Sequence, residues 1–204
     1  IFSACWPMYA AMPAVLKDAI ERSYQKVGWD LRNSESEKGI FPTFFDLLDI
    51  LPGVIEESHY SKDTQSDYVG ALCTRVKSLT NGIYGSVLCA EDALSDAEMF
   101  DQNVIVDLSR VGSMETKSLL MGILVMKLQE YRMCSSGMNS RLRHVTVLEE
   151  AHNLLRKTSA EQSQEGANLQ GKSVEMLANA IAEMRTYGEG FIIADQAPGL
   201  LDMS

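Results

Sequence analysis

Short apolar runs alternate with long helical patterns through the second half of the chain, and this alternation constrains the fold most. The apolar runs are Asn103–Ser109, Val145–Glu149 and Phe191–Ala194, separated by helical patterns over Ser113–Met133 and Val174–Met184. Strand, helix, strand, helix, strand is the order of a parallel sheet with right-handed crossover connections. We therefore expect an α/β fold for residues 83–204, with the three runs as buried strands.

Polar side chains stand at the end of each predicted strand. These are Asp107 with Ser109 and Arg110, Glu149 with Glu150, and Asp195 with Gln196. The carboxyl ends of parallel strands share one edge of a sheet, where open α/β sheets bind ligands. Two interpretations of the paired glutamates stay open at this point. They belong to a functional site, or they only cap the helix that follows, where negative charge is favoured.

Residues 1–82 are predicted to form a mostly helical subregion with no catalytic pattern of its own. The predicted helices cover residues 12–27, a stretch that begins at the capping box Thr43–Asp46, and residues 63–79. Pro52-Gly53 is expected to interrupt the second helix. Residues 83–89 are predicted to be a strand or an irregular segment, and Gly82 and Gly85 weaken the strand assignment.

Composition indicates a soluble globular protein in the cytoplasm. The chain has 204 residues, is 46% hydrophobic and carries a net charge of −10, and its apolar runs fall far short of the roughly 20 residues that cross a bilayer. No secretory leader is recognisable at the start. The four cysteines form no C-x-x-C pair, so we expect reduced thiols and no structural metal. The negative charge argues against nonspecific coating of nucleic acid but leaves room for a local basic groove or pore.

Gly166–Ser173 matches the phosphate-loop pattern G-x-x-x-x-G-K-[ST] in every position. The mechanism behind that pattern needs a buried strand that leads into the glycines. Here the preceding residues, Lys157–Glu165, are too polar for a buried strand, and the match follows the acidic strand instead of preceding it. We interpret it as a chance match in a linker that enters a helix.

Three segments in order resemble the HerA/FtsK-type branch of the P-loop ATPases, the hexameric DNA translocases and helicases. They are NVIVDLS at Asn103–Ser109, VTVLEEAHN at Val145–Asn153, and the stretch from Ala182 through Asp195-Gln196 to Pro198. Ile1–Pro13 is also similar to bacterial members of this group. The resemblance implies a RecA-like parallel sheet flanked by helices, with a Walker B-like strand at Val145–Asn153.

The resemblance also implies roles for individual residues and a set of partners. Glu149 would hold Mg²⁺, directly or through water, although most P-loop enzymes have aspartate there, and Glu150 would orient or deprotonate the attacking water. Gln196 would sense the γ-phosphate of ATP. Arg185 is a candidate finger that reaches a phosphate, in cis or in trans, and the alternative is a solvated arginine at a helix end. The implied partners are DNA, further copies in a hexamer, and a nuclease, with no membrane.

The chain departs from the family in lacking a genuine phosphate loop, which we expect upstream of Ile1 in a longer protein. This piece would then hold the hydrolysis side of the site, and we predict that alone it neither binds ATP tightly nor hydrolyses it. Two other functions stay open. One is a non-catalytic module for oligomerisation or interaction. The other is a metal-dependent hydrolase that uses Asp107, Glu149, Glu150 and Asp195 around Mg²⁺ or Mn²⁺.

Overall fold

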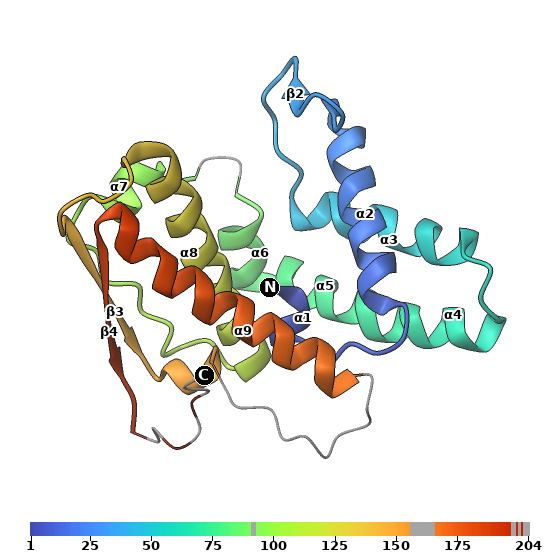
Figure 1. The fold of residues 1–204 in the computed structure, drawn as a ribbon. Helices are drawn as coiled ribbons and strands as arrows, with labels where there is room; N and C mark the ends of the chain where they lie inside the picture. Colours follow the sequence, from blue (N-terminus) through green and yellow to red (C-terminus); the bar gives the residue numbers. More distant parts are fainter. Residues whose placement is uncertain (91–92, 156–165, 197–198, 200, 202–204) are drawn as a thin grey trace. The chain divides into compact units, whose positions relative to one another are not determined.

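The computed structural model describes residues 1–90, 93–155, 166–196, 199 and 201, with the backbone alone for residues 166–173. It has a mixed α/β fold (Figure 1), as the sequence predicts. The chain divides into two compact units, which are described separately. The helical unit covers Tyr9–Ala93, and the sheet unit combines Ile1–Met8 with Leu94–Ser204. The bounds of these units differ from the predicted ranges, 1–82 and 83–204.

The helical unit consists of consecutive helices around an apolar core. Its elements are α2 (Met12–Lys26), the short pair β1 (Trp29–Asp30) and β2 (Glu35–Ser36), α3 (Phe44–Glu57), α4 (Lys62–Tyr68), a π-helical turn (Val69–Cys73), α5 (Thr74–Thr80) and α6 (Gly82–Leu88). The predicted helices and the capping box between Thr43 and Asp46 are confirmed. Leu16, Leu51 and Leu72 lie at the centre of this core, almost fully buried.

Two local predictions for this unit are wrong. Pro52 does not interrupt α3, because buried side chains on both sides of it, such as Leu51 and Ile55, hold the two halves of the helix against the core. Tertiary burial here outweighs the hydrogen bond that proline cannot make. Residues 83–89 are neither strand nor irregular, since α6 occupies most of them. Gly85 packs so closely on the carbonyl of Thr80 that a Cβ would not fit.

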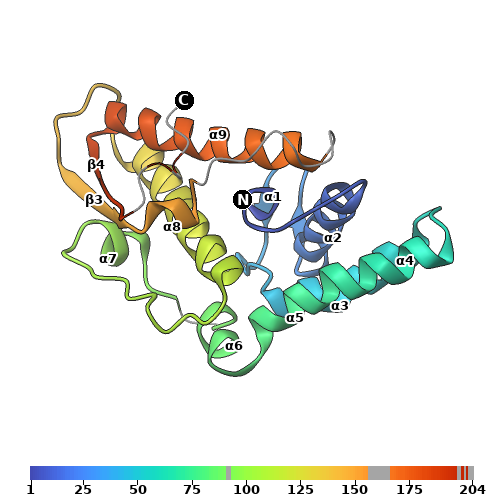
Figure 2. The ribbon, with the colours of Figure 1, turned by 90° about the horizontal axis from the view of Figure 1, so that it is seen from below.

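The sheet unit contains a short parallel sheet with helices on one side. Its elements are α1 (Phe2–Cys5), α7 (Asp96–Phe100), α8 (Met114–Ser135), β3 (His144–Glu149), a 3-10 turn (Ala151–Asn153), α9 (Gly166–Met184), a second 3-10 turn (Arg185–Tyr187) and β4 (Glu189–Ala194). Strands β3 and β4 pair in parallel, in register from His144 with Glu189 to Glu149 with Ala194. Figures 1 and 2 show α8 and α9 on the same side of this sheet.

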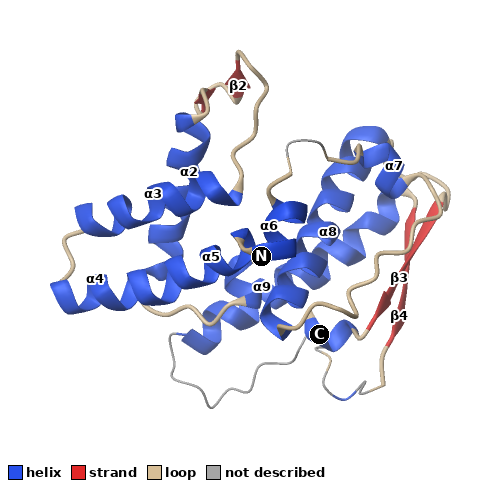
Figure 3. Ribbon diagram, turned by 180° about the vertical axis from the view of Figure 1, so that it is seen from behind, coloured by secondary structure: helices blue, strands red, loops and turns tan. Residues whose placement is uncertain are grey.

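The prediction of a buried strand over Asn103–Ser109 is wrong. In the described residues the parallel sheet has two strands, and this segment is unpaired, with Ile105 94% exposed; Figure 3 draws it as a loop. Hydrogen bonds hold the chain before the segment and at its end. Asp101 binds Arg132, and Asp107 accepts the backbone N–H of Ser109. The strands themselves are also less buried than predicted, because Val147 and Ile192 are exposed on the face away from the helices.

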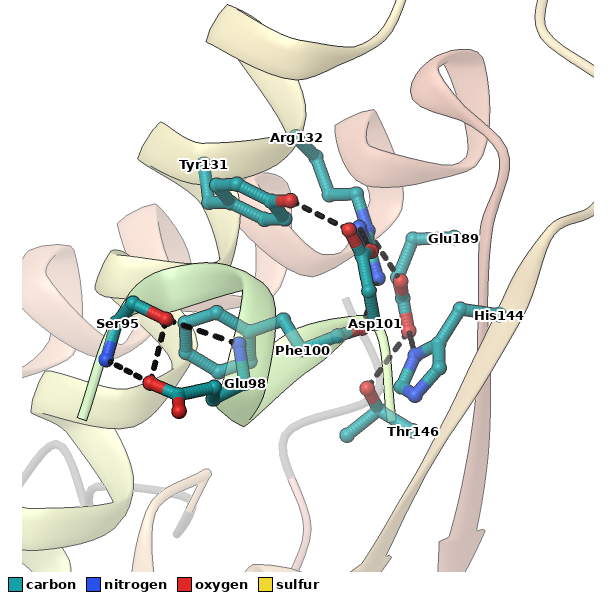
Figure 4. A network of polar contacts seen from close by, with 9 residues as sticks. All are labelled: Ser95, Glu98, Phe100, Asp101, Tyr131, Arg132, His144, Thr146 and Glu189. Atoms are coloured by element: carbon teal, nitrogen blue, oxygen red, sulfur yellow. Dashed lines mark hydrogen bonds and ion pairs between the residues drawn. The ribbon is translucent and has the colours of Figure 1, made fainter. Parts of the chain in front are cut away.

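A buried polar cluster joins the first residues of β3 and β4 to α8 (Figure 4). The Glu189 side chain has no solvent exposure and accepts hydrogen bonds from Arg132 Nε at 2.8 Å and Thr146 Oγ1 at 2.7 Å. His144 Nδ1 lies 2.8 Å from Oε1 of the same carboxylate. Arg132 also binds Asp101 at 2.6 Å. These partners satisfy the buried charge, and they fix the amino ends of the strands relative to α8.

None of the helices in the described part of the chain combines the length and the apolar composition that crossing a membrane would require.

Candidate active site

A recess of about 300 Å³ lies at the carboxyl edge of the sheet. It is lined by Glu149, Glu150, Ala194, Asp195 and Gln196. Because Glu149 pairs with Ala194 in the parallel register, the residues that follow each strand emerge side by side. The structure therefore brings together the acidic end of one predicted strand and the Asp-Gln end of the next.

Glu150 has a left-handed backbone conformation, with φ 54° and ψ 42°. Its N–H donates to the carbonyl of Ala194 at 2.9 Å, and its own carbonyl accepts the N–H of Asn153 at 3.0 Å and Asn153 Nδ2 at 2.9 Å. For a residue with a Cβ this conformation costs about 1–2 kcal/mol. The hydrogen bonds hold Glu150 in a costly conformation at the tip of the sheet, which is typical of functional positions.

The interpretation of the acids as helix caps does not describe Glu150. The residue precedes the 3-10 turn Ala151–Asn153, and its side chain makes no capping hydrogen bond to that turn. The next α-helix after it, α9, begins only at Gly166. The Glu150 carboxylate instead lines the recess, where it is 45% exposed.

His152 and Asp195 add an imidazole and a buried carboxylate beside Glu150. The Asp195 side chain is 2% exposed and accepts the backbone N–H of His152 at 2.8 Å. Its two carboxylate oxygens also lie 3.0 and 3.1 Å from His152 Nδ1. On the other side of the ring, His152 Nε2 is 3.6 Å from Glu150 Oε2, an ion-pair distance longer than a hydrogen bond.

Sequence reasoning did not select His152 as a site residue. The signal that points to His152 is its position two residues after Glu150. This position lies just beyond the end of β3, at the same edge of the sheet as Asp195, which follows β4. Without the pairing register of β3 with β4, nothing in the sequence shows that this histidine and this aspartate meet.

The residues around the recess suit a cation that is held mainly by other ligands. Mg²⁺ in nucleotide sites takes one or two protein carboxylates and completes its shell with phosphate oxygens and water. Glu149 and Glu150 offer two such carboxylates. The described residues contain no group of three or more side chains suited to hold a metal. Two carboxylates suit a cation such as Mg²⁺ whose remaining ligands come from water or another bound molecule.

Three other sequence candidates lie outside the recess. Arg185 is exposed in the 3-10 turn before β4. The strand lies between it and the carboxyl edge, and the five steps from Glu189 to Ala194 span about 17 Å at ~3.3 Å each. Asp107 does not line the recess. The stretch from Gly166 to Ser173 is α-helical from its first residue, so the loop that phosphate binding requires is not formed there. The linker before it, Lys157–Glu165, lies outside the described residues.

Comparison of the chain with family models, curated proteins and solved structures gives no match. The chemistry of the recess is therefore inferred from its own residues. One edge of the parallel sheet carries two exposed carboxylates, an imidazole bound to a third carboxylate, and an amide. Such groups are able to bind a cation, orient a water molecule and accept a proton.

Proposed function

We propose that the recess is the hydrolysis side of an ATP site in a DNA translocase or helicase of the HerA/FtsK type. The observation that carries this proposal is the convergence of Glu149, Glu150 and Gln196 at the ends of two paired parallel strands. Ligands of open α/β sheets bind at this edge. The order of the segments along the chain supports the same assignment, because the VTVLEEAHN strand precedes the strand that ends in Asp195-Gln196.

In this proposal Glu150 acts on the attacking water. As the water oxygen forms a bond to the γ-phosphorus, its proton passes to the Glu150 carboxylate, and the bond from the γ-phosphorus to the bridging oxygen breaks. The products are ADP and inorganic phosphate. The side-chain amide of Gln196 donates a hydrogen bond to the γ-phosphate and senses its release. Bound Mg²⁺ neutralises charge on the phosphates, and Glu149 is the carboxylate that would hold it, directly or through water.

In the same proposal, β3 and β4 are two strands of a larger RecA-like sheet. The phosphate-binding loop would come from residues outside the described part of the chain. Arg185 would act in trans, from a neighbouring subunit of a hexameric ring, because within one chain it lies at the opposite end of β4. DNA would pass through the assembled ring, and a nuclease would be a further partner.

ATP turnover tests this function. The rate is measured with Mg²⁺ and DNA, both for the 204-residue chain and for the longest natural polypeptide that contains it. Glu150→Gln should lower kcat of the longer polypeptide by about 100-fold or more, because the amide cannot accept the proton. Glu130→Gln, at an exposed position of α8, is the matched control and should leave kcat unchanged. Equal turnover of the two variants, or no turnover in the wild type, contradicts the proposal.

An interaction module is the second candidate function, and a specific observation favours it. The sheet face away from α8 and α9 exposes Val145, Val147 and Ile192. Parallel sheets are normally covered on both faces, so an apolar open face is typical of a surface that another element or partner covers. The turnover measurement separates the two functions, since a module that only binds would give Glu150→Gln the same activity as the wild type.

A further inference from the structure

His152 stands between two carboxylates that come from different strands. Asp195 follows β4 and is buried, whereas Glu150 follows β3 and faces the recess. We propose that His152, fixed by Asp195, is a positioning residue that holds the Glu150 carboxylate in place for its work on water. This inference rests on the proposed function for the catalytic role of Glu150. The geometry of the three side chains stands independently of that role.

The partners of Asp195 determine the orientation of the imidazole. An ionised carboxylate only accepts hydrogen bonds, so His152 Nδ1, at 3.0 and 3.1 Å from its two oxygens, must carry the proton. The backbone N–H of His152 donates to the same carboxylate at 2.8 Å. Two donors of one residue therefore bind one buried acid, which leaves the ring little freedom to turn. With Nδ1 committed to Asp195, Nε2 faces Glu150.

The hydrogen bonds of Glu150 fix its backbone but do not orient its carboxylate. A neighbouring side chain such as His152 is therefore needed to do so. It is 45% exposed, and its only described ionic partner is His152 Nε2 at 3.6 Å. The ring limits the rotamers that the carboxylate populates by occupying the space beside it, and when Nε2 also carries a proton the imidazolium attracts the carboxylate by charge. A displacement of about 1 Å of a catalytic group can lower a rate by about 100-fold, so restricting these rotamers matters for turnover.

Nuclear magnetic resonance of the imidazole nitrogens tests the geometry in the 204-residue chain without nucleotide. The three histidines, His59, His144 and His152, are few enough to assign individually. The expected result is a protonated, hydrogen-bonded Nδ1 in His152, and a Glu150→Gln change that shifts the Nε2 resonance of His152 but not the resonances of exposed His59. A bare Nδ1, or an Nε2 that does not respond to Glu150→Gln, overturns the inference.

Two substitutions of His152 separate positioning from a structural role. Asparagine places an N–H donor near the position of Nδ1 and removes Nε2, whereas glutamine places its amide near the position of Nε2 and loses the Nδ1 donor. If Nε2 positions Glu150, His152→Asn lowers kcat by about 10–100-fold with an unchanged KM for ATP, and His152→Gln retains more activity. If His152 only secures the fold through Asp195, the order of the two variants is reversed or their activities are equal.

Thermal unfolding of both variants accompanies the kinetics and identifies losses that come from misfolding. His152→Asn keeps the contact with Asp195, so it should stay folded and provide the decisive kinetic comparison.

Failure of the proposed function gives a different experimental result from failure of this inference. Without any wild-type turnover the ATPase assignment fails, and the resonance measurement still decides whether Asp195 and Glu150 flank His152 as described.

Discussion

The left-handed conformation of Glu150 makes a prediction about stability that needs no nucleotide. Residues with a Cβ other than asparagine and aspartate rarely adopt φ near 54°. Replacing Glu150 by asparagine should remove most of a cost of about 1–2 kcal/mol. The same change removes the contact between the carboxylate and His152, which is worth at most about 1 kcal/mol even for a charged pair that is half exposed. Glu150→Asn should therefore raise the free energy of unfolding by up to about 1–2 kcal/mol, or leave it unchanged.

Comparison with alanine isolates the backbone contribution. Glu150→Ala loses the same ion pair but keeps a Cβ without asparagine's tolerance of the left-handed region. The asparagine variant should be more stable than the alanine variant by about 1 kcal/mol, and the lost contact with His152 cancels from this difference. Glu149, in the extended backbone of β3, provides the matched control. Its asparagine variant should have no such advantage over its alanine variant, because both residues are depleted in strands.

Urea unfolding followed by far-ultraviolet circular dichroism measures these differences. The midpoints are compared directly if the slopes of the four variants agree, since a changed slope would indicate a changed unfolded or native state. A Glu150→Asn variant no more stable than Glu150→Ala would refute the claim that this position stores backbone strain. A stabilised Glu150→Asn variant that has lost ATP turnover would show that the fold keeps an unfavourable residue there for its chemistry.

Three further predictions concern other parts of the chain. Arg132→Met should lower the free energy of unfolding by about 3–5 kcal/mol, because it leaves the carboxylate of Glu189 buried without its cation; adding Glu189→Gln should recover much of the loss in the same urea experiment. Ile105→Ser should change stability by less than about 0.5 kcal/mol, as expected for an exposed side chain, whereas a loss of several kcal/mol would show that the segment is a buried strand. Burial raises the pKa of the Cys5 thiol to about 11, so iodoacetamide should modify exposed Cys134 at pH 8 and leave Cys5 unmodified. Because the raised pKa favours the thiol in the folded state, the contribution of Cys5 to stability is lost as the pH rises toward that value, and rapid alkylation of Cys5 in the folded protein at pH 8 would contradict its burial.

Local signals in the sequence determined much of the secondary structure. The apolar spacing over residues 12–27 and 113–133 predicts helices, because a stripe with a period of 3.6 residues is enough to indicate the element. The structure has these helices at Met12–Lys26 and Met114–Ser135. The capping box at Thr43–Asp46 was readable for a similar reason, since its hydrogen bonds join residues three apart. The apolar run of β3 with its acidic end predicted a parallel strand that delivers Glu149 and Glu150 to an edge.

Failed predictions concern whether an apolar segment becomes buried and whether tertiary contacts override a local preference. Asn103–Ser109 has the composition of a core strand, yet in the described residues no strand pairs with it and the segment stays exposed. Pro52 has the local preference of a helix breaker, yet α3 continues through it. In both cases the decisive contacts lie outside the segment, so its own residues do not reveal them.

The sequence by itself determined that two glutamates end an apolar strand and that Asp195-Gln196 ends another. Only the tertiary structure decided that these ends form one recess, that Glu150 is left-handed, and that His152 lies between Asp195 and Glu150. The physical reason is that spacing along a chain specifies local periodicity, whereas the meeting of residues more than forty positions apart depends on strand register. Arg185 shows the same limit, because its distance from the recess follows from the direction of β4.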